Sequence, residues 1–322
     1  MKKEYPMKYN STYRVVTAND LITGHQKMTL RESQLLSIAI SQVVAEDTDL
    51  KTYVTTVPEL ANFMGIDENS LYKDLKGICR SLCQRIVEVQ KGSNKWEIYN
   101  WVDAASYDNG KLTLHLSERL KPFLLELESF YSQPMLGALM TFRSYYATRL
   151  YQYLLAVSGS KWNTIEEWSF SCEQLRELFQ TTVRDTKGKV IKELYKRNYN
   201  LIQKTIKPAL AELAASDYAY VYDYIEEAEH IPGKRGKPSI AGVRFKVILF
   251  EDDKRRTAAE KKAFFIEKTK PHVENIGGKN MTEFGSAAIA NGKPQEPNGA
   301  DEEYEQIAFA GCEGMAEPTD KE

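Results

Sequence analysis

The chain is poor in cysteine and histidine and has no long apolar run. Its 322 residues contain four cysteines and four histidines, and the N-terminal MKKEYPMKYN leads into no apolar segment. Four scattered cysteines do not make a disulfide framework, and a membrane helix needs about 20 mostly apolar residues in a row. We therefore expect a protein of the reducing cytoplasm, with no membrane partner.

Patterns that would indicate catalysis or cofactor binding are also missing. Neither SGSKWN nor GKRGKPS has the spacing of a phosphate-binding GxxxxGK[ST] loop. The histidines are isolated, and Cys79 and Cys83 have no third metal ligand near them in the sequence. The sequence thus predicts a protein that is not an enzyme and holds no metal or cofactor.

Charge is distributed unevenly along the chain, although the whole carries a formal net charge of only -2. Residues 251–322 hold ten Lys/Arg and sixteen Asp/Glu, so the remaining 250 residues carry 33 basic against 29 acidic groups. We expect the acidic segment to be a largely disordered tail with a helical start near RRTAAEKKAFFIEK. The tail hides a mildly basic body.

Within that body one order of elements occurs first over residues 29–116. TLRESQLLSIAISQVVA predicts a helix that begins with a capping box of Thr29 and Glu32. The β-branched run TYVTTV, a short helix that ends at Gly65 and a longer helix over 69–85 follow. The alternating runs IVEVQ, WEIYNWVDAASY and KLTLHLS then predict a hairpin. Helix, strand, two helices and hairpin is the order of a winged helix.

The same order recurs over residues 144–249. SYYATRLYQYLLAVS predicts a helix, EEWSFS a strand and CEQLRELFQ a short helix that Ser171 caps. A longer helix over 191–215 and the strands YAYVYDYIEEAE and GVRFKVILF complete it. We therefore predict an α+β fold of two tandem winged-helix domains with a flexible acidic tail, divided as 1–13 (N-terminal arm), 14–133, 134–250 and 251–322.

Charge indicates which copy reads DNA. Residues 57–85 balance four basic groups with four acidic ones, whereas residues 184–207 carry eight basic groups against Asp185 and Glu193. Phosphate contacts supply most non-specific DNA affinity, so the second copy is the better candidate. An ordinary solvated helix face would show the same excess of lysine.

The helix predicted over 191–215 divides into two faces. Ile191, Leu194, Tyr195, Ile202, Ile206, Leu210 and Leu213 would form its core stripe. Pro208 would bend the axis, because it cannot donate to the carbonyl of Lys204. Arg, Lys, Asn and Gln side chains can read base edges in the major groove, and the candidates off the stripe are Lys192, Lys196, Arg197, Asn198, Asn200, Gln203, Lys204 and Lys207.

A second basic element is the predicted hairpin loop HIPGKRGKPSIA. Lys234, Arg235 and Lys237 lie among glycine and proline at its tip, and Arg244 follows on the return strand. Such a tip can lie along phosphates or enter the minor groove. An ordinary solvated turn is the alternative.

Several segments resemble the replication initiator (Rep) proteins of theta-replicating, iteron-bearing plasmids. The resemblance covers about residues 14 to 250 and depends on the order and spacing of five segments: ANDLITGHQKMTLRESQLLSIAISQV, VPELANFMGIDENSLYKDLKGICRSL, LTLHLSERLKPFLLEL, SYYATRLYQYLL and LIQKTIKPALAEL. The long basic loop and the acidic tail depart from the family pattern.

The resemblance implies a function and partners. Such proteins bind repeated sites in double-stranded origin DNA as monomers, help to open the origin and bring in the host initiator and replicative helicase. As dimers paired through the N-terminal domain, many repress their own gene. The resemblance gives the C-terminal domain the main base contacts, and Lys73, Lys76 and Arg80 contacts to phosphates. It makes Arg149 structural, with a contact to the DNA backbone as an alternative.

Two other functions remain open from the sequence. One is a winged-helix transcriptional regulator without a role in replication. The other is a rolling-circle nickase, which would need a tyrosine beside a metal-binding histidine pair; the chain has 19 tyrosines but no such pair.

Overall fold

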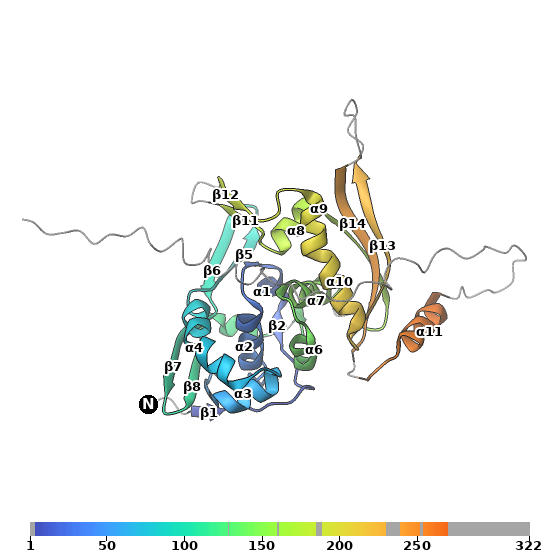
Figure 1. The fold of residues 1–322 in the computed structure, drawn as a ribbon. Helices are drawn as coiled ribbons and strands as arrows, with labels where there is room; N and C mark the ends of the chain where they lie inside the picture. Colours follow the sequence, from blue (N-terminus) through green and yellow to red (C-terminus); the bar gives the residue numbers. More distant parts are fainter. Residues whose placement is uncertain are drawn as a thin grey trace, which may run out of the picture. The chain divides into compact units, whose positions relative to one another are not determined.

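The computed structural model describes residues 4–127, 129–159, 161–184, 189–229, 239–251 and 254–269. These residues belong to one compact unit, residues 1–271 (Figure 1). The fold is α+β, as the sequence predicts: helices mix with small sheets whose strands pair antiparallel, except for the parallel pair of β1 and β4.

The N-terminal half follows the predicted order closely. Its elements are β1 (Glu4–Pro6), β2 (Thr17–Ala18), α1 (Asn19–Thr23), β3 (His25–Gln26), α2 (Leu30–Ile40), β4 (Thr52–Thr56), α3 (Val57–Met64), α4 (Glu68–Leu82), β5 (Ile86–Gly92), β6 (Lys95–Asn100), β7 (Val102–Asp108), β8 (Lys111–Leu116), the 3-10 helix η1 (Glu118–Leu120), α5 (Lys121–Leu124) and β9 (Tyr131–Ser132).

The C-terminal half adds a second helix-and-sheet group. Its elements are α6 (Leu136–Thr141), α7 (Tyr145–Val157), β10 (Ile165–Ser171), α8 (Cys172–Leu178), β11 (Thr182–Arg184), β12 (Val190–Glu193), α9 (Asn198–Lys204), α10 (Ile206–Ala215), β13 (Ala219–Glu229), β14 (Ser239–Leu249) and α11 (Ala258–Thr269).

Local capping signals fix the helix boundaries as expected. Thr29 and Glu32 form the predicted capping box of α2, and Ser171 caps α8 in the same way with Gln174. Helix α3 ends at Gly65, whose φ of 65° is left-handed and favours glycine. These predictions are confirmed. Such features can be predicted because each depends on contacts within one turn of helix.

The hairpin strands of the N-terminal half lie in two sheets. Strands β3, β5 and β6 form one, and β7 joins β8, β4 and β1 in another. The run WEIYNWVDAASY, predicted as one strand, is divided at Trp101. This residue is 3% exposed, and its backbone N–H donates to the carbonyl of Arg85. Burial of this indole among long-range neighbours breaks the strand, and no local pattern indicates it.

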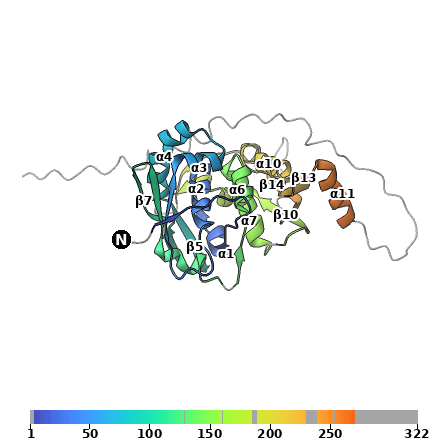
Figure 2. The same cartoon turned by 90° about the horizontal axis from the view of Figure 1, so that it is seen from below.

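Helix α7 joins the two halves (Figure 2). It packs against α1 and α2 on one side and against α10 on the other. Leu150, Tyr151, Leu154 and Leu155 are fully buried. The segment SYYATRLYQYLLAVS is therefore a central core helix.

The helix predicted over 191–215 is not continuous, and its first part is wrong. Residues 190–193 form strand β12, which pairs antiparallel with β11, so Lys192 lies opposite Val183 in a hairpin. Ile191 is 66% exposed and Leu194 and Tyr195 are half-buried, whereas Ile202, Ile206, Leu210 and Leu213 are buried as predicted. The β-branched pair Val190 and Ile191 suits a strand, and this preference outweighs the helical spacing.

Helix α11 confirms the predicted helical start of the C-terminal segment. It packs beside β13 on the sheet of order β10-β14-β13 (Figure 1). The rest of the predicted acidic tail lies outside the described residues.

Candidate nucleic-acid interface

Helix α9 presents a basic and amide-rich surface. Its apolar side chains, Leu201 and Ile202, are fully buried and orient the helix. The opposite side, together with the residues just before α9 and at the start of α10, is called here the α9 surface. It consists of Lys196, Arg197, Tyr199, Asn200, Gln203, Lys204 and Lys207, which are exposed except for the half-buried Gln203.

Tyr199 is the member of this surface that the sequence analysis missed. Its side chain is 60% exposed between Asn198 and Asn200. A tyrosine can contact both sugar and phosphate, because it combines an apolar ring with a hydrogen-bonding tip. Tyr199 lies next to Asn200 in the sequence. It belongs neither to the predicted core stripe nor to the Lys, Arg, Asn and Gln residues that are candidates for base contacts.

Arg176 on α8 positions the chain that leads into α9. Its Nε donates to Glu193 Oε1 at 2.5 Å, and its Nη2 donates to the carbonyls of Tyr195 at 2.9 Å and Lys196 at 3.3 Å. Its Nη1 donates to Asn198 Oδ1 at 3.1 Å. One guanidinium thus ties the end of β12 to the first turn of α9.

Asn198, a predicted DNA-binding residue, is part of this structural network. Besides accepting from Arg176, its Nδ2 donates to the carbonyl of Ile240 on β14 at 2.6 Å. Because both ends of the amide are bonded within the protein, we leave Asn198 out of the proposed DNA-reading set.

The predicted bend near Pro208 lies one turn earlier. Thr205, with φ -120° and ψ -78°, ends α9 and precedes α10, and its Oγ1 donates to the carbonyl of Leu201 at 2.7 Å. Pro208 is the third residue of α10, where a backbone N–H would have no partner within the helix. Proline is therefore tolerated there without disturbing α10.

Carboxylates of the sheet contact some of the predicted basic residues. Lys207 Nζ lies 3.4 Å from Glu226 Oε1, which also accepts from Gln203 Nε2 at 3.3 Å. Arg244 lies between Glu167 at 3.5 Å and Glu227 at 3.4 Å. These exposed pairs are weak, so a phosphate can compete for the same cations.

Four further predicted contacts of the C-terminal half are Lys192, Lys234, Arg235 and Lys237. Lys192 is exposed on the hairpin of β11 and β12 rather than on a helix. Lys234, Arg235 and Lys237 lie outside the described residues, in the segment between β13 and β14.

Helix α4 carries a second basic surface. Lys73, Lys76 and Arg80 are all exposed, and their spacing places them along one side of the helix. Leu71, Leu75 and Leu82 are buried on the other side. We call Lys73, Lys76 and Arg80 the α4 stripe.

Arg149 is not on the surface, so the predicted alternative of a DNA-backbone contact is corrected. It is 2% exposed on α7, and its guanidinium donates to the carbonyls of Ile22, of Gly24 at 2.8 Å and of Leu178 at 3.4 Å. Burial lowers the pKa of Arg149, but a guanidinium keeps its proton. Its role is structural, as the other alternative predicted, and it links the α1–β3 segment to α8.

Another cation lies near the contact between the two halves. Lys27 comes directly after β3. Strand β3 pairs with β5, and β5 begins at the residue after Arg85. Burial and the charges of Arg85 and Lys192 lower the pKa of Lys27 to about 8. Arg85 itself forms a bidentate ion pair with the buried Glu32, at 2.8 and 3.0 Å.

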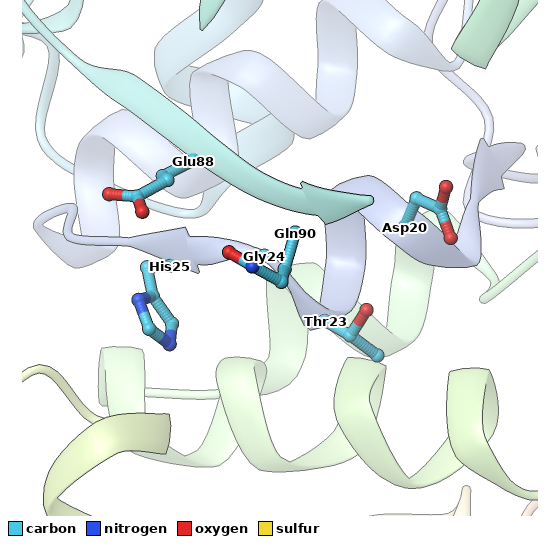
Figure 3. A pocket seen from close by; sticks show the side chains of 6 residues that line it. All are labelled: Asp20, Thr23, Gly24, His25, Glu88 and Gln90. Atoms are coloured by element: carbon cyan, nitrogen blue, oxygen red, sulfur yellow. The ribbon is translucent and has the colours of Figure 1, made fainter. Parts of the chain in front are cut away.

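A small pocket beside the Arg149 contacts brings together no reactive groups. In Figure 3 the carboxylates of Asp20 and Glu88 lie at opposite ends of it, and His25 points away from both. The lining residues are Asp20, Thr23, Gly24, His25, Glu88 and Gln90.

The described ranges contain no set of three His, Cys, Asp or Glu side chains placed to hold a metal. Burial raises the pKa of the Cys79 thiol to about 12, which keeps it protonated and unreactive. Among the helices that the structure describes, none has the length and apolar composition of a membrane span.

Comparisons with known proteins find similarity both in sequence and in fold. The family described as "Initiator Replication protein, WH1" matches residues 14–155. A curated "Replication initiation protein" from Escherichia coli is 30% identical over 146 residues, which are 44% of this chain and 46% of that protein. The match therefore spans about half the length of this relative.

A solved structure shares the fold over a longer range. The crystal structure of Pi initiator protein in complex with iteron DNA superposes with a TM-score of 0.59 and 16% identity, and it covers 76% of this chain and 100% of that chain. At this identity the likeness is one of fold. Residues 14–155 are thus similar in sequence to the initiator replication protein family, and a longer part of the chain is similar in fold to a solved initiator.

Proposed function

We propose that this protein is a plasmid replication initiator that binds repeated origin sites, or iterons, in double-stranded DNA and promotes opening of the origin. The observation that carries the proposal is the match of residues 14–155 to the initiator replication family. The exposed α9 surface supports it, because side chains of types that can read base edges project there from a helix whose apolar side is buried.

In this proposal the chain contains two tandem winged-helix domains, residues 14–133 and 134–250. The second is the main DNA-reading domain: Arg197, Asn200 and Gln203 contact base edges, while Lys196, Lys204, Lys207, Lys192 and Tyr199 contact the backbone. The α4 stripe of the first domain contacts phosphates. Arg244 and the segment with Lys234, Arg235 and Lys237 add a further backbone contact.

We also propose partners by analogy with the family. The host initiator and the replicative helicase join the protein at the opened origin. A homodimer, paired through residues 14–133 and in equilibrium with the monomer, represses the protein's own gene. The proposal includes no catalytic step.

A minimal-replicon assay tests the proposal. A plasmid that carries the origin and this gene should persist in its host, and deletion of the gene should abolish replication unless the protein is supplied in trans. Persistence without the gene would instead favour a transcriptional regulator of the same fold.

A further inference from the structure

Helix α11 packs back on the sheet that precedes it in the chain (Figures 1 and 2). The ring of Phe265 lies 4.0 Å from that of Tyr222 on β13, and the ring of Phe264 lies 5.5 Å from that of Phe250 just after β14. With Ile248 these side chains form one apolar cluster. The cluster fixes α11 to both long strands of the C-terminal half.

The N-terminus of α11 is held close to the end of α10. Thr257 and Glu260 cap α11 reciprocally, with Thr257 N–H donating to Glu260 Oε2 at 2.7 Å and Glu260 N–H donating to Thr257 Oγ1 at 3.2 Å. The backbone N–H of Arg256 donates to Asp217 Oδ1 at 3.3 Å, and its guanidinium lies 4.2 Å from the ring centre of Phe250. Asp217 comes two residues after α10 ends.

Lys261 connects α11 directly to α10. Its side chain is only 4% exposed, and its Nζ donates to the carbonyl of Ala214 at 3.2 Å and to that of Ser216. The last carbonyls of a helix have no partner within it and carry partial negative charge, so an ammonium group complements them well. Among the lysines in the part of the chain that the structure describes, Lys261 alone is buried.

Burial acts against the charge of Lys261. Burial lowers the pKa of Lys261 below its ordinary value, Asp217 partly opposes this change, and Arg256 adds to it. A lysine whose folded pKa lies below the unfolded value favours the unfolded chain while it is charged, and this penalty is relieved as pH rises through the folded pKa.

We propose that Lys261 is a positioning residue for DNA reading: it holds the C-terminal end of α10 to a helix anchored on β13 and β14, and so sets the orientation of the α9 surface relative to that sheet. The inference rests on the proposed DNA-binding function. In this proposal α11 contributes to DNA binding indirectly: it contacts α10 and the sheet rather than the α9 surface.

Three variants of the full-length chain test this role. Lys261→Met keeps the apolar stem and removes the ammonium donor, and Lys261→Arg restores a cationic donor. Lys262→Met is the matched control, because Lys262 is the next residue and is exposed.

The first measurement is amide hydrogen exchange without DNA. Lys261→Met should exchange about tenfold faster in the last turn of α10, since a charge-assisted hydrogen bond to its carbonyls is lost. Lys261→Arg should restore the protection, and Lys262→Met should match the wild type. Unchanged exchange in Lys261→Met would overturn the proposal, whatever the protein binds.

The second measurement is affinity for origin repeats together with the thermal midpoint. Lys261→Met should bind repeats about tenfold more weakly, and Lys261→Arg should recover most of the affinity. The melting temperature of Lys261→Met should stay close to that of the wild type, because relief of the buried charge offsets the lost hydrogen bonds. Wild-type affinity in Lys261→Met, an equal loss in Lys262→Met, or a loss that only accompanies a lower melting temperature would contradict the positioning role. If the wild type shows no preference for repeats, the proposed function fails, and the exchange data still decide whether Lys261 holds α10.

Discussion

At the scale of single residues, Arg149 is a buried cation bonded to backbone carbonyls. Its three acceptors, on Ile22, Gly24 and Leu178, come from segments far apart in the sequence. Loss of the guanidinium leaves these carbonyls unsatisfied in a site closed to water.

We predict that Arg149→Met lowers the free energy of unfolding by about 3 kcal/mol, because unsatisfied buried polar groups are costly. Urea unfolding followed by circular dichroism measures the change. Arg143→Met is the control, since Arg143 is exposed just before the same helix and should change stability little. If the free energy of unfolding falls equally in the two variants, the hydrogen bonds of Arg149 to the carbonyls do not stabilise the fold.

Lys27 provides a prediction about pH. Its pKa of about 8 reflects burial and the charges of Arg85 and Lys192. Because this value lies below that of lysine in the unfolded chain, the charged form favours unfolding, and stability should rise with pH from about 8 toward the unfolded value near 10.4.

The measurement is the free energy of unfolding at pH 7, 8 and 9 for wild type and Lys27→Met. In Lys27→Met the free energy of unfolding should rise less between pH 8 and pH 9 than in the wild type. If both proteins show the same dependence on pH, Lys27 titrates like an ordinary lysine.

At the scale of elements, we expect residues of the α9 surface to read DNA and the neighbouring Asn198 to hold the helix. Arg197→Ala or Asn200→Ala should weaken binding to the repeat by roughly 1–3 kcal/mol and relax preference at one position, as expected when a base contact is lost. Asn198→Ala should instead lower the melting temperature, because its amide bonds Arg176 and Ile240. Titration of duplexes with each position substituted gives the result, and equal affinity for all substituted duplexes would exclude base reading by Arg197 and Asn200.

The α4 stripe should behave differently. Lys76→Ala should weaken binding to every duplex to a similar degree and lower the slope of log affinity against log salt by about one, since one phosphate contact is lost. Glu59→Gln, a charge change of similar size on the neighbouring α3, serves as the comparison. A sequence-dependent effect of Lys76→Ala would place α4 among the base-reading elements.

The sequence predicts elements well where the signal is local and fails where it depends on distant partners. The capping box of Thr29 and the left-handed Gly65 are contained within one turn, so α2 and α3 were predictable. The break at Trp101 depends on burial, and the hairpin of β11 and β12 uses Val190 and Ile191, whose spacing also suits a helix. The α9 surface follows from side-chain periodicity, whereas Arg176 and Lys261 act through carbonyls that no sequence pattern reveals.

At the scale of the whole molecule, the distribution of charge along the chain indicates DNA binding, whereas the total charge does not. The first 250 residues carry 33 basic against 29 acidic groups, although the complete chain has a formal charge of -2. The α9 surface and the α4 stripe concentrate part of that positive charge on two exposed helices. Arg149 and Lys261 are instead buried, and each donates to backbone carbonyls of other segments.

The central claim is that these surfaces serve sequence-specific binding at a plasmid origin. Footprinting of the purified protein on its own origin tests this claim most directly, with the Arg197→Ala, Asn200→Ala double variant as control. We expect regularly spaced protection over direct repeats, which the double variant loses at the same concentration. Protection of a chromosomal promoter alone, or equal protection by the double variant, would contradict it.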